Sequence, residues 1–522
     1  MEADARQAGF ILGVGLLGYL HLFSQTDFFY YLQRKEEDLS VAILLGAAAS
    51  HLGSGDSSIS RMITLHAPPF AKGHGGDYDI PTSVKSAALI AFGLLHFQTG
   101  NRQMVEVMLY EIGHRHAMNH RECYSLSAGI ALGLLLLGKG SELPGLTDVQ
   151  VWQRLRRLVV GGEASREETH DFMAHLHGST TALSGSQAEV VTSYRETERI
   201  NTSVTTPAAL VALALTYCQT NDELVLRDSA LVLPSTLFAI SSMRPDILLL
   251  LVICRYMIHW DAVIPTRQWI ASRVPRVLSH YLENPSNKVD MFLVHESALY
   301  MRAGASYAIG LRHAGTNQTA ALRCLMEEAE SLIALRSKLK TNLYLRAPHV
   351  DMCLTTVLYG LAMVTAGTGN IEVLTILRRL HRRCDSESTY GFHLAVHQCM
   401  GLVLLGSGTL TLGHSPRAVA SLFLSLFPLL PVTPQDSQHH LQALRHFYVF
   451  AVEDRILCTK NALTGEIEQV PLQIGVKNKN ESSSNTDPEV VYHAVTAPCV
   501  LPDLSSVVSI ALDGEKCPEY FP

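Results

Sequence analysis

A glycine-rich apolar segment that recurs along the chain restricts its fold more than any other feature. The segment "AGFILGVGLLG" (8–18) aligns with "AGIALGLLLLG" (128–138), and three glycines coincide at an offset of 120 residues. The same frame occurs in eight copies, each closed by a turn, with turn positions at residues 18, 53, 98, 138, 218, 315, 367 and 406. The closest copies are 35 to 52 residues apart, the length of one supersecondary unit. Residues 246–260 have the composition of a degenerate further copy in one of the longer gaps.

Each unit is expected to be a helical hairpin. The apolar part runs ten to fourteen residues without strand-like alternation, and an amphipathic segment such as 371–383 follows. Glycine inside a helix costs about 1 kcal/mol relative to alanine, so recurring glycines need a compensating contact. Gly9 with Gly13, and Gly129 with Gly133, share a helix face, where we expect a neighbouring helix to approach closely. The glycine that ends each run suits a left-handed helix cap, and stacked hairpins form an α-solenoid.

Two patterns typical of nucleotide binding lie inside these repeats. Gly13, Gly15 and Gly18 have the spacing G-x-G-x-x-G, and Asp38 follows at the distance expected for a ribose contact. The segment "GLLLLGKG" (133–140) approaches a phosphate-binding loop, but glycine replaces the metal-binding hydroxyl residue. Because both patterns belong to the repeat, we interpret their glycines as packing residues and expect no cofactor. An enzyme that used them would lose nucleotide binding on Gly13→Leu, whereas we expect that variant to overpack a helix contact.

Composition narrows the class of protein. Of the 522 residues, 47% are hydrophobic and only 17% charged, which suits helices buried on most of their surface. The net charge is −7 without a lysine–arginine block, so we expect no nucleic-acid partner. The apolar runs fall short of a membrane span and no basic leader precedes them, which predicts a soluble intracellular protein without membrane contact. The ten cysteines form no C-x-x-C pair, and we expect buried thiols, such as Cys254, Cys353 and Cys399.

The histidines invite a metal or acid–base interpretation. One group has the spacing H-x-H-x-x-x-H, formed by His114, His116 and His120. No acid-flanked H-E-x-x-H accompanies it and arginines flank it, so we expect no metal site. A second group lies at a predicted helix start and comprises His439, His440 and His446. We expect structural or partner contacts there, and no catalytic residue anywhere in the chain.

Acidic residues and possible phosphorylation sites are weaker indications of function. Glu327, Glu328 and Glu330 form a cluster on one predicted helix, which we interpret as a solvated face. Ser415–Pro416 and Thr433–Pro434 fit proline-directed kinases only loosely. A phosphate at either position would add charge to a loop between repeats.

Helical hairpins with this glycine pattern resemble the proteasome/cyclosome (PC) repeat. That repeat occurs in the two large non-ATPase subunits of the proteasome regulatory particle and in the subunit 1 family of the anaphase-promoting complex. Four segments resemble the latter family, in its order and with high specificity: 121–145, 390–413, 439–457 and 496–504. The resemblance covers essentially the whole chain.

The resemblance implies a non-catalytic scaffold in a ubiquitin ligase that acts in mitosis, in nucleus and cytoplasm. It implies repeats that close into a ring of two concentric helical layers. Implied partners are the cullin and RING subunits, the DOC-domain subunit, the tetratricopeptide-repeat subunits and the WD40 coactivator. The alternative is a scaffold of the proteasome regulatory particle. Family members are far longer and carry a WD40-like propeller, so we expect this chain to be a fragment, a short isoform or an incomplete gene model.

Past residue 454 the sequence pattern changes. "ILCTKNALTGEIEQVPLQIGVK" alternates around a turn signal and predicts short strands. The sequence therefore predicts an all-α solenoid, closing into a toroid, over residues 1–453, with an inserted loop at about 161–200. A small β-rich appendage is predicted over 454–522, with a polar linker at 477–489.

Overall fold

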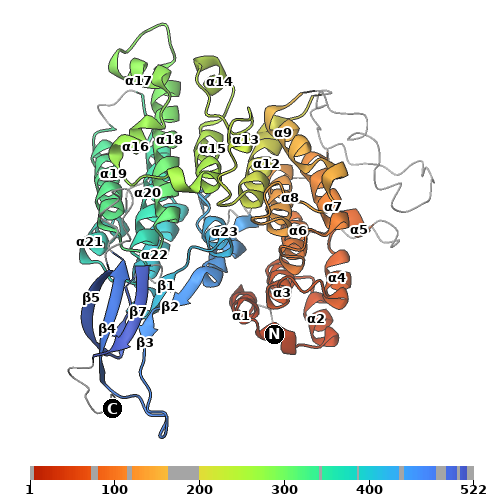
Figure 1. Ribbon diagram of the computed structural model, residues 1–522. Coiled ribbons are helices and arrows are strands. Elements are labelled where there is room, and N and C mark those ends of the chain that lie inside the picture. The colour runs from red at the N-terminus through yellow and green to blue at the C-terminus, as the bar shows by residue number, and fades with distance from the viewer. Residues whose placement is uncertain are drawn as a thin grey trace.

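The computed structural model (Figure 1) describes most of the chain. The described residues are 5–71, 80–114, 120–162, 199–339, 344–384, 387–433, 440–477, 490–502 and 506–513. Almost all of the predicted insert at 161–200 and of the predicted linker at 477–489 lies outside these ranges. The described chain is mostly helical, with a small group of strands near its C-terminal end.

One row of apolar helices forms the centre of the molecule, and each helix packs against the next in chain order. The row consists of α1 (Ala5–Leu16), α3 (Glu37–Ser50), α6 (Thr82–Leu95), α8 (Arg121–Leu135), α12 (Thr202–Thr216), α15 (Pro245–Ile258), α18 (Met291–Arg312), α20 (Ala347–Val364) and α22 (Tyr390–Val403). Figure 1 shows the row as an arc that runs from red to cyan. The position of α15 confirms that residues 246–260 are a copy of the repeat.

A second set of helices covers the row from outside. Outer helices pack against the row helix that follows them, as α7 (Arg102–Gly113) does on α8, α9 (Val151–Val160) on α12 and α19 (Thr319–Ser337) on α20. The others are α2 (Gln25–Leu32), α4 (Ser57–Thr64), α5 (Pro68–Ala71), α13 (Glu223–Leu226), α14 (Leu237–Ser241), α16 (Arg267–Ser272), α17 (Arg276–Glu283) and α21 (Ile371–His381). The predicted helical hairpins are therefore confirmed.

Glycine lets the row helices approach until their backbones touch. A Cβ on Gly15 would overlap the backbone of Gly46, and one on Gly310 would overlap the backbone of Gly360. Gly129 meets the backbone of the next helix in the same way, and Gly133 lies against a leucine side chain. The prediction is wrong for Gly9 and Gly13, because a Cβ on either would meet nothing within 4 Å.

The turns after the row helices form a repeated backbone connection. In the turn after α8, Gly138 and Gly140 have positive φ, and their N–H groups donate to the carbonyls of Leu215 and Thr216 at the end of α12. The same two-bond step joins α3 to α6, α6 to α8, α12 to α15, α18 to α20 and α20 to α22. Its left-handed positions are Gly53, Gly55, Gln98, Gly100, Gln219, Asn221, Gly315, Asn317, Gly367 and Gly369.

The residue after the second left-handed position often begins the outer helix. Asn101 accepts from the N–H of Met104 at 3.2 Å, and Asn370 accepts from the N–H of Val373 at 3.1 Å. Asp56 and Asp222 cap α4 and α13 in the same way. The turn sequence therefore ends one helix, binds its neighbour and starts the next helix.

The segment after the row turns back toward its beginning. Helix α23 (Pro416–Ser425) contacts α18, and the 3₁₀ segment η6 (His440–Ala451) contacts α23, α1 and α6. Strand β1 (Leu410–Leu412) pairs antiparallel with β2 (Val452–Asp454). Because α23 and η6 lie between these strands in the sequence, the pairing brings the two ends of this segment together.

The remaining strands form the predicted C-terminal β cluster. The three-stranded antiparallel sheet has β4 (Val470–Lys477) at its centre, between β5 (Val490–Ala497) and β7 (Val507–Leu512). A two-stranded pair joins β3 (Ile456–Leu457) to β6 (Cys499–Val500). Strand β1 lies before residue 454, so strand structure begins earlier than the sequence predicts, although β1 is only three residues long.

Within the described residues, α20 is the helix that is long and apolar enough to cross a membrane by length and composition. The expectation that no apolar segment reaches this length is therefore wrong for α20. Of the 18 residues of α20, 83% are buried inside the structure, as expected for a helix in the core of a protein.

Replacing Gly310 by alanine should destabilise the protein by about 1–3 kcal/mol, because the added Cβ overlaps the backbone of α20. The matched control is Gly401→Ala in α22, where a Cβ meets nothing within 4 Å. That variant should gain up to about 1 kcal/mol from helix propensity. Thermal unfolding followed by circular dichroism measures both, and equal melting temperatures would contradict the close-packing interpretation.

Replacing Gly138 by alanine tests the turn. The Cβ itself has room, since its nearest neighbour is Pro416 at 3.6 Å, so the cost of about 1–2 kcal/mol comes from the left-handed backbone. Gly138→Asn should cost clearly less, because asparagine tolerates this conformation and Asn221 and Asn317 already adopt it. Urea unfolding compares the variants; an alanine variant as stable as the asparagine variant would refute the prediction.

Candidate functional site

Arg445 of η6 joins the C-terminal segment to the end of α23. Its side chain is only 3% exposed. It donates to the carbonyls of Ser425 at 3.2 Å and Phe427 at 2.6 Å, and to the carbonyl of Leu429. Burial lowers the pKa of this guanidinium. The orphan carbonyls at the helix end are thus satisfied by one buried cation.

Two buried tyrosines complete this junction from the row helices. Tyr307 of α18 donates to the carbonyl of Leu426 at 3.2 Å, and Tyr359 of α20 donates to Gln398 Oε1 of α22 at 2.6 Å. Burial raises the pKa of both phenols above the usual value, so both remain neutral donors. Tyr307 thus joins α18 to the returning segment, and Tyr359 joins α20 to α22; both phenols lie near Arg445.

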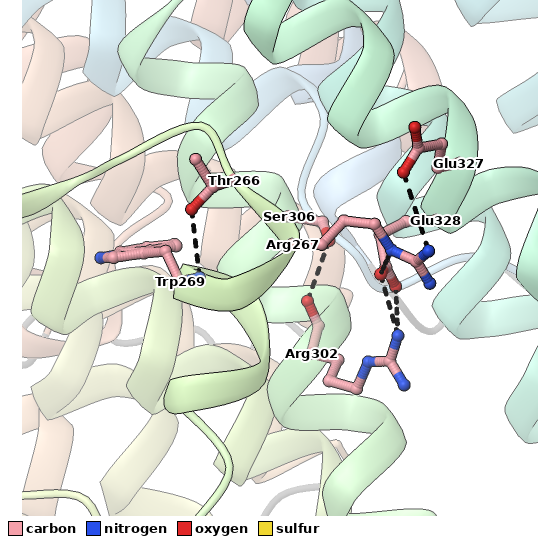
Figure 2. Close-up of polar contacts among 7 residues, drawn as sticks. All are labelled: Thr266, Arg267, Trp269, Arg302, Ser306, Glu327 and Glu328. Carbon is pink, nitrogen blue, oxygen red and sulfur yellow. Dashed lines mark hydrogen bonds and ion pairs between the residues drawn. The ribbon is translucent and has the colours of Figure 1, made fainter.

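A second polar cluster joins α16, α18 and α19 (Figure 2). Glu328 of α19 is 3% exposed and accepts two bonds of 2.8 Å from Arg302 Nη2 of α18. Arg267 Nε of α16 donates to the same carboxylate at 3.2 Å and approaches Glu327 at 3.7 Å. The predicted solvated face is therefore wrong for Glu328, whose position on α19 turns it inward, and right for the exposed Glu327 and Glu330.

A second buried carboxylate joins α19, α20 and the segment just after α21. Asp351 of α20 accepts from Arg336 Nε at 3.1 Å and from both Nη atoms of Arg383, at 2.8 and 2.6 Å. The Glu328 and Asp351 clusters each pair one buried acid with two arginines from neighbouring elements. This arrangement fixes the position of outer helices against the row.

The structure gives the nucleotide-like patterns a different role. Residues Ala5–Leu16 are a helix and precede the turn at Gly18, so Gly13, Gly15 and Gly18 follow no strand as a dinucleotide site requires. In the segment 133–140 the N–H groups of the two left-handed glycines already bind helix carbonyls. Groups engaged in this way are not available to cradle a phosphate.

The histidines that the structure describes have individual structural surroundings. No group of three or more His, Cys, Asp or Glu side chains suited to a metal occurs among the described residues. His116 and His439 lie outside those residues, as does the side chain of His440. His114 stacks on Tyr110 with ring centroids 4.6 Å apart, and His120 precedes α8 in a left-handed conformation. His446 lies beside Arg445, and burial lowers its pKa.

The other candidates have structural roles where the structure describes them. Ser415 is the N-cap of α23 and accepts from the N–H of Ala418 at 3.2 Å; Thr433 is exposed, and Pro434 lies outside the described residues. Cysteines in the row helices are buried as predicted and are not in disulfides: Cys254, Cys353 and Cys399. Burial raises their thiol pKa values.

Apart from Glu328, the sequence patterns did not single out the residues that hold the clusters together. Arg445, Tyr307 and Asp351 are isolated polar residues within apolar segments. Such residues are rarely buried without partners, so each was a signal for a buried polar contact, although the partner was not identifiable.

The geometry defines a protein built from helical-hairpin repeats, with a row of close-packed helices and buried ionic clusters between them. Comparison with known protein families identifies the family of these repeats. Residues 57–453 match the APC1 fifth domain, and residues 1–52 match the APC1 fourth domain. The chain belongs to the family of anaphase-promoting complex subunit 1.

Curated relatives support this over nearly the full chain. Anaphase-promoting complex subunit 1 of Homo sapiens is 33% identical over 528 residues, covering 99% of this chain and 26% of the relative. The Arabidopsis thaliana protein of the same name is 32% identical, covering 100% and 31%. "Negative regulator of mitosis" of Emericella nidulans is 31% identical, covering 100% and 23%. The chain thus spans about a quarter of the length of these relatives.

Removing the Glu328 carboxylate tests the ionic cluster. Glu328→Ala should destabilise the protein by about 1–3 kcal/mol, because Arg302 and Arg267 lose their shared acceptor. The loss of stability should be smaller than for breaking a fully buried ion pair, because both arginines are partly exposed. Glu330→Ala, on the exposed face, should change stability by less than about 0.5 kcal/mol. Urea unfolding distinguishes the two; similar losses would show that the cluster does not stabilise the fold.

Proposed function

We propose that this chain is part of the scaffold of an anaphase-promoting complex, a cullin–RING-type ubiquitin ligase that controls mitotic progression. The observation that carries the proposal is the match to the subunit 1 family across 99–100% of the chain. We further propose that the chain is not itself catalytic. The buried groups of the clusters around Arg445, Glu328 and Asp351 join neighbouring elements, which suits a frame that positions other subunits.

The finer part of the proposal is that the hairpins form a solenoid that closes into a ring. Support comes from η6, which follows the last row helix and contacts α1 and α6 at the other end of the row. Helix α23 is bonded at both ends to different parts of the row. Before α23, the carbonyl of His414 accepts from Gln219 Nε2, in the turn after α12, at 2.8 Å. After α23, the carbonyl of Leu426 accepts from the hydroxyl of Tyr307 of α18.

The proposed partners are the cullin and RING subunits, the DOC-domain subunit, the tetratricopeptide-repeat subunits and the WD40 coactivator. The proposed compartments are nucleus and cytoplasm. The family assignment supports partners of this kind, since relatives bear the name of a numbered subunit of one complex.

Affinity purification of the tagged 522-residue chain from dividing cells, with mass spectrometry, tests the function. We expect the cullin, RING and tetratricopeptide-repeat subunits to co-purify. The matched control is Gly310→Leu, which should break the contact between α18 and α20 and reduce recovery of those subunits.

Two results would contradict the proposal. Recovery of proteasome base subunits in place of ligase subunits would favour the proteasome scaffold considered from the sequence. A folded chain that recovers neither set would show that this part of the protein does not assemble into the complex.

A further inference from the structure

A cavity of about 590 Å³ lies between α22 and η6. Its walls are mainly apolar, with Leu394 and Leu402 on the α22 side. Tyr390 lies on its rim and is 46% exposed, so the cavity is open to solvent. The volume falls in the range of sites that bind ligands or side chains of a partner, about 300–1,000 Å³.

Gly401 leaves one wall of this cavity without a side chain. In three other row helices the glycine five residues before the turn position lies against the next helix: Gly93, Gly133 and Gly310. Gly401 holds the same place in α22, but it is exposed and a Cβ there would meet nothing within 4 Å. Glycine in the interior of α22 therefore lowers the stability of the helix, and in the described part of the chain no packing contact at Gly401 compensates for it. A segment placed against Gly401 could approach α22 as closely as the row helices approach one another.

Arg445 supplies the second, independent observation. This buried cation lines the cavity, and it donates hydrogen bonds to three carbonyls and to the side chain of Gln442. These bonds occupy four of its five N–H donors, which leaves one on Nη2. No Asp or Glu is among the described residues that line the cavity. A buried cation is costly without a counter-charge, so the cavity favours an anionic group.

A histidine lies on the rim, and exposed arginines lie at the end of the neighbouring helix α21. Burial and the neighbouring histidines lower the pKa of His397, so the positive charge here comes from the arginines. His397 of α22 lies in contact with His381 of α21, with Nε2 and Nδ1 2.9 Å apart. Arg378 and Arg382, close to His381 in sequence, are exposed and form no ion pair with any residue that the structure describes. Exposed arginines on the helix that packs against α22 favour the approach of an acidic peptide.

We propose that the cavity between α22 and η6 docks an acidic peptide segment of a partner protein. The segment passes over Gly401, fills the cavity with apolar side chains and brings a carboxylate beside Arg445. The inference goes beyond the proposed scaffold role and is measured on the isolated chain, so it succeeds or fails independently of assembly into a ligase.

A random twelve-residue peptide library displayed on phage, selected on the full 522-residue chain, tests the proposal. Selected peptides are synthesised with a fluorescent label and their binding is measured by anisotropy. Arg445 itself is unsuitable for mutation because its loss would break the junction with α23. The informative variant is Gly401→Leu, whose side chain occupies the cavity without a backbone clash. Gly13→Leu is the matched control, since it adds the same side chain at an equally open helical glycine elsewhere.

We expect selected peptides with net negative charge that bind the wild-type chain and Gly13→Leu equally. Gly401→Leu should weaken binding at least about tenfold, and His397→Glu should weaken it by adding negative charge at the exposed rim. Thermal unfolding confirms that both variants are folded. Failure to select any peptide, selection of neutral or basic peptides only, or binding that Gly401→Leu leaves unchanged would each overturn the proposal.

Discussion

The close approach of neighbouring row helices is the constraint on which the rest of this structure depends. Where Gly15 meets Gly46 and Gly310 meets Gly360, two backbones are in contact and no side chain separates them. Helices at this distance bury nearly their whole surface, which is why helices such as α6 and α12 are apolar on all sides and show no amphipathic face. Polar surface is left to the outer helices and the turns.

The repeat and its helices were predictable because they depend on local pattern. Recurring glycines, apolar runs of ten or more residues and turn sequences ending in Asn or Asp each specify a helix, its end and the start of the next. Even the degenerate copy at 246–260 followed from spacing. The assignment of Gly13 as a packing residue failed because the face a helix presents depends on tertiary packing: in α1 the contact uses Gly15 instead.

The buried polar clusters were not predictable for a related reason. Glu328 and Glu330 are two residues apart in one acidic stretch, yet one is buried between two arginines and the other is exposed. The difference arises from partners on helices 26 and 61 residues away in sequence. A single sequence shows which residues carry charge, but the partner of each charge depends on how the helices are placed in space.

In the described chain, the turn-to-helix hydrogen bonds join each pair of neighbouring row helices from α3 to α22 except α15 and α18, and the terminal contact between α1 and α3 also lacks them. Between α15 and α18, Arg312 instead reaches Asp261 at 3.4 Å and lies over the ring of Trp260. Backbone bonds fix how far each helix can slide along its neighbour, whereas long side chains yield by changing rotamer. From α3 to α22 the row is thus stiff to shear on both sides of the contact between α15 and α18 and compliant at that contact. Strain applied to the row at α3 and α22 would concentrate between α15 and α18, dividing this part of the frame into two mechanical halves.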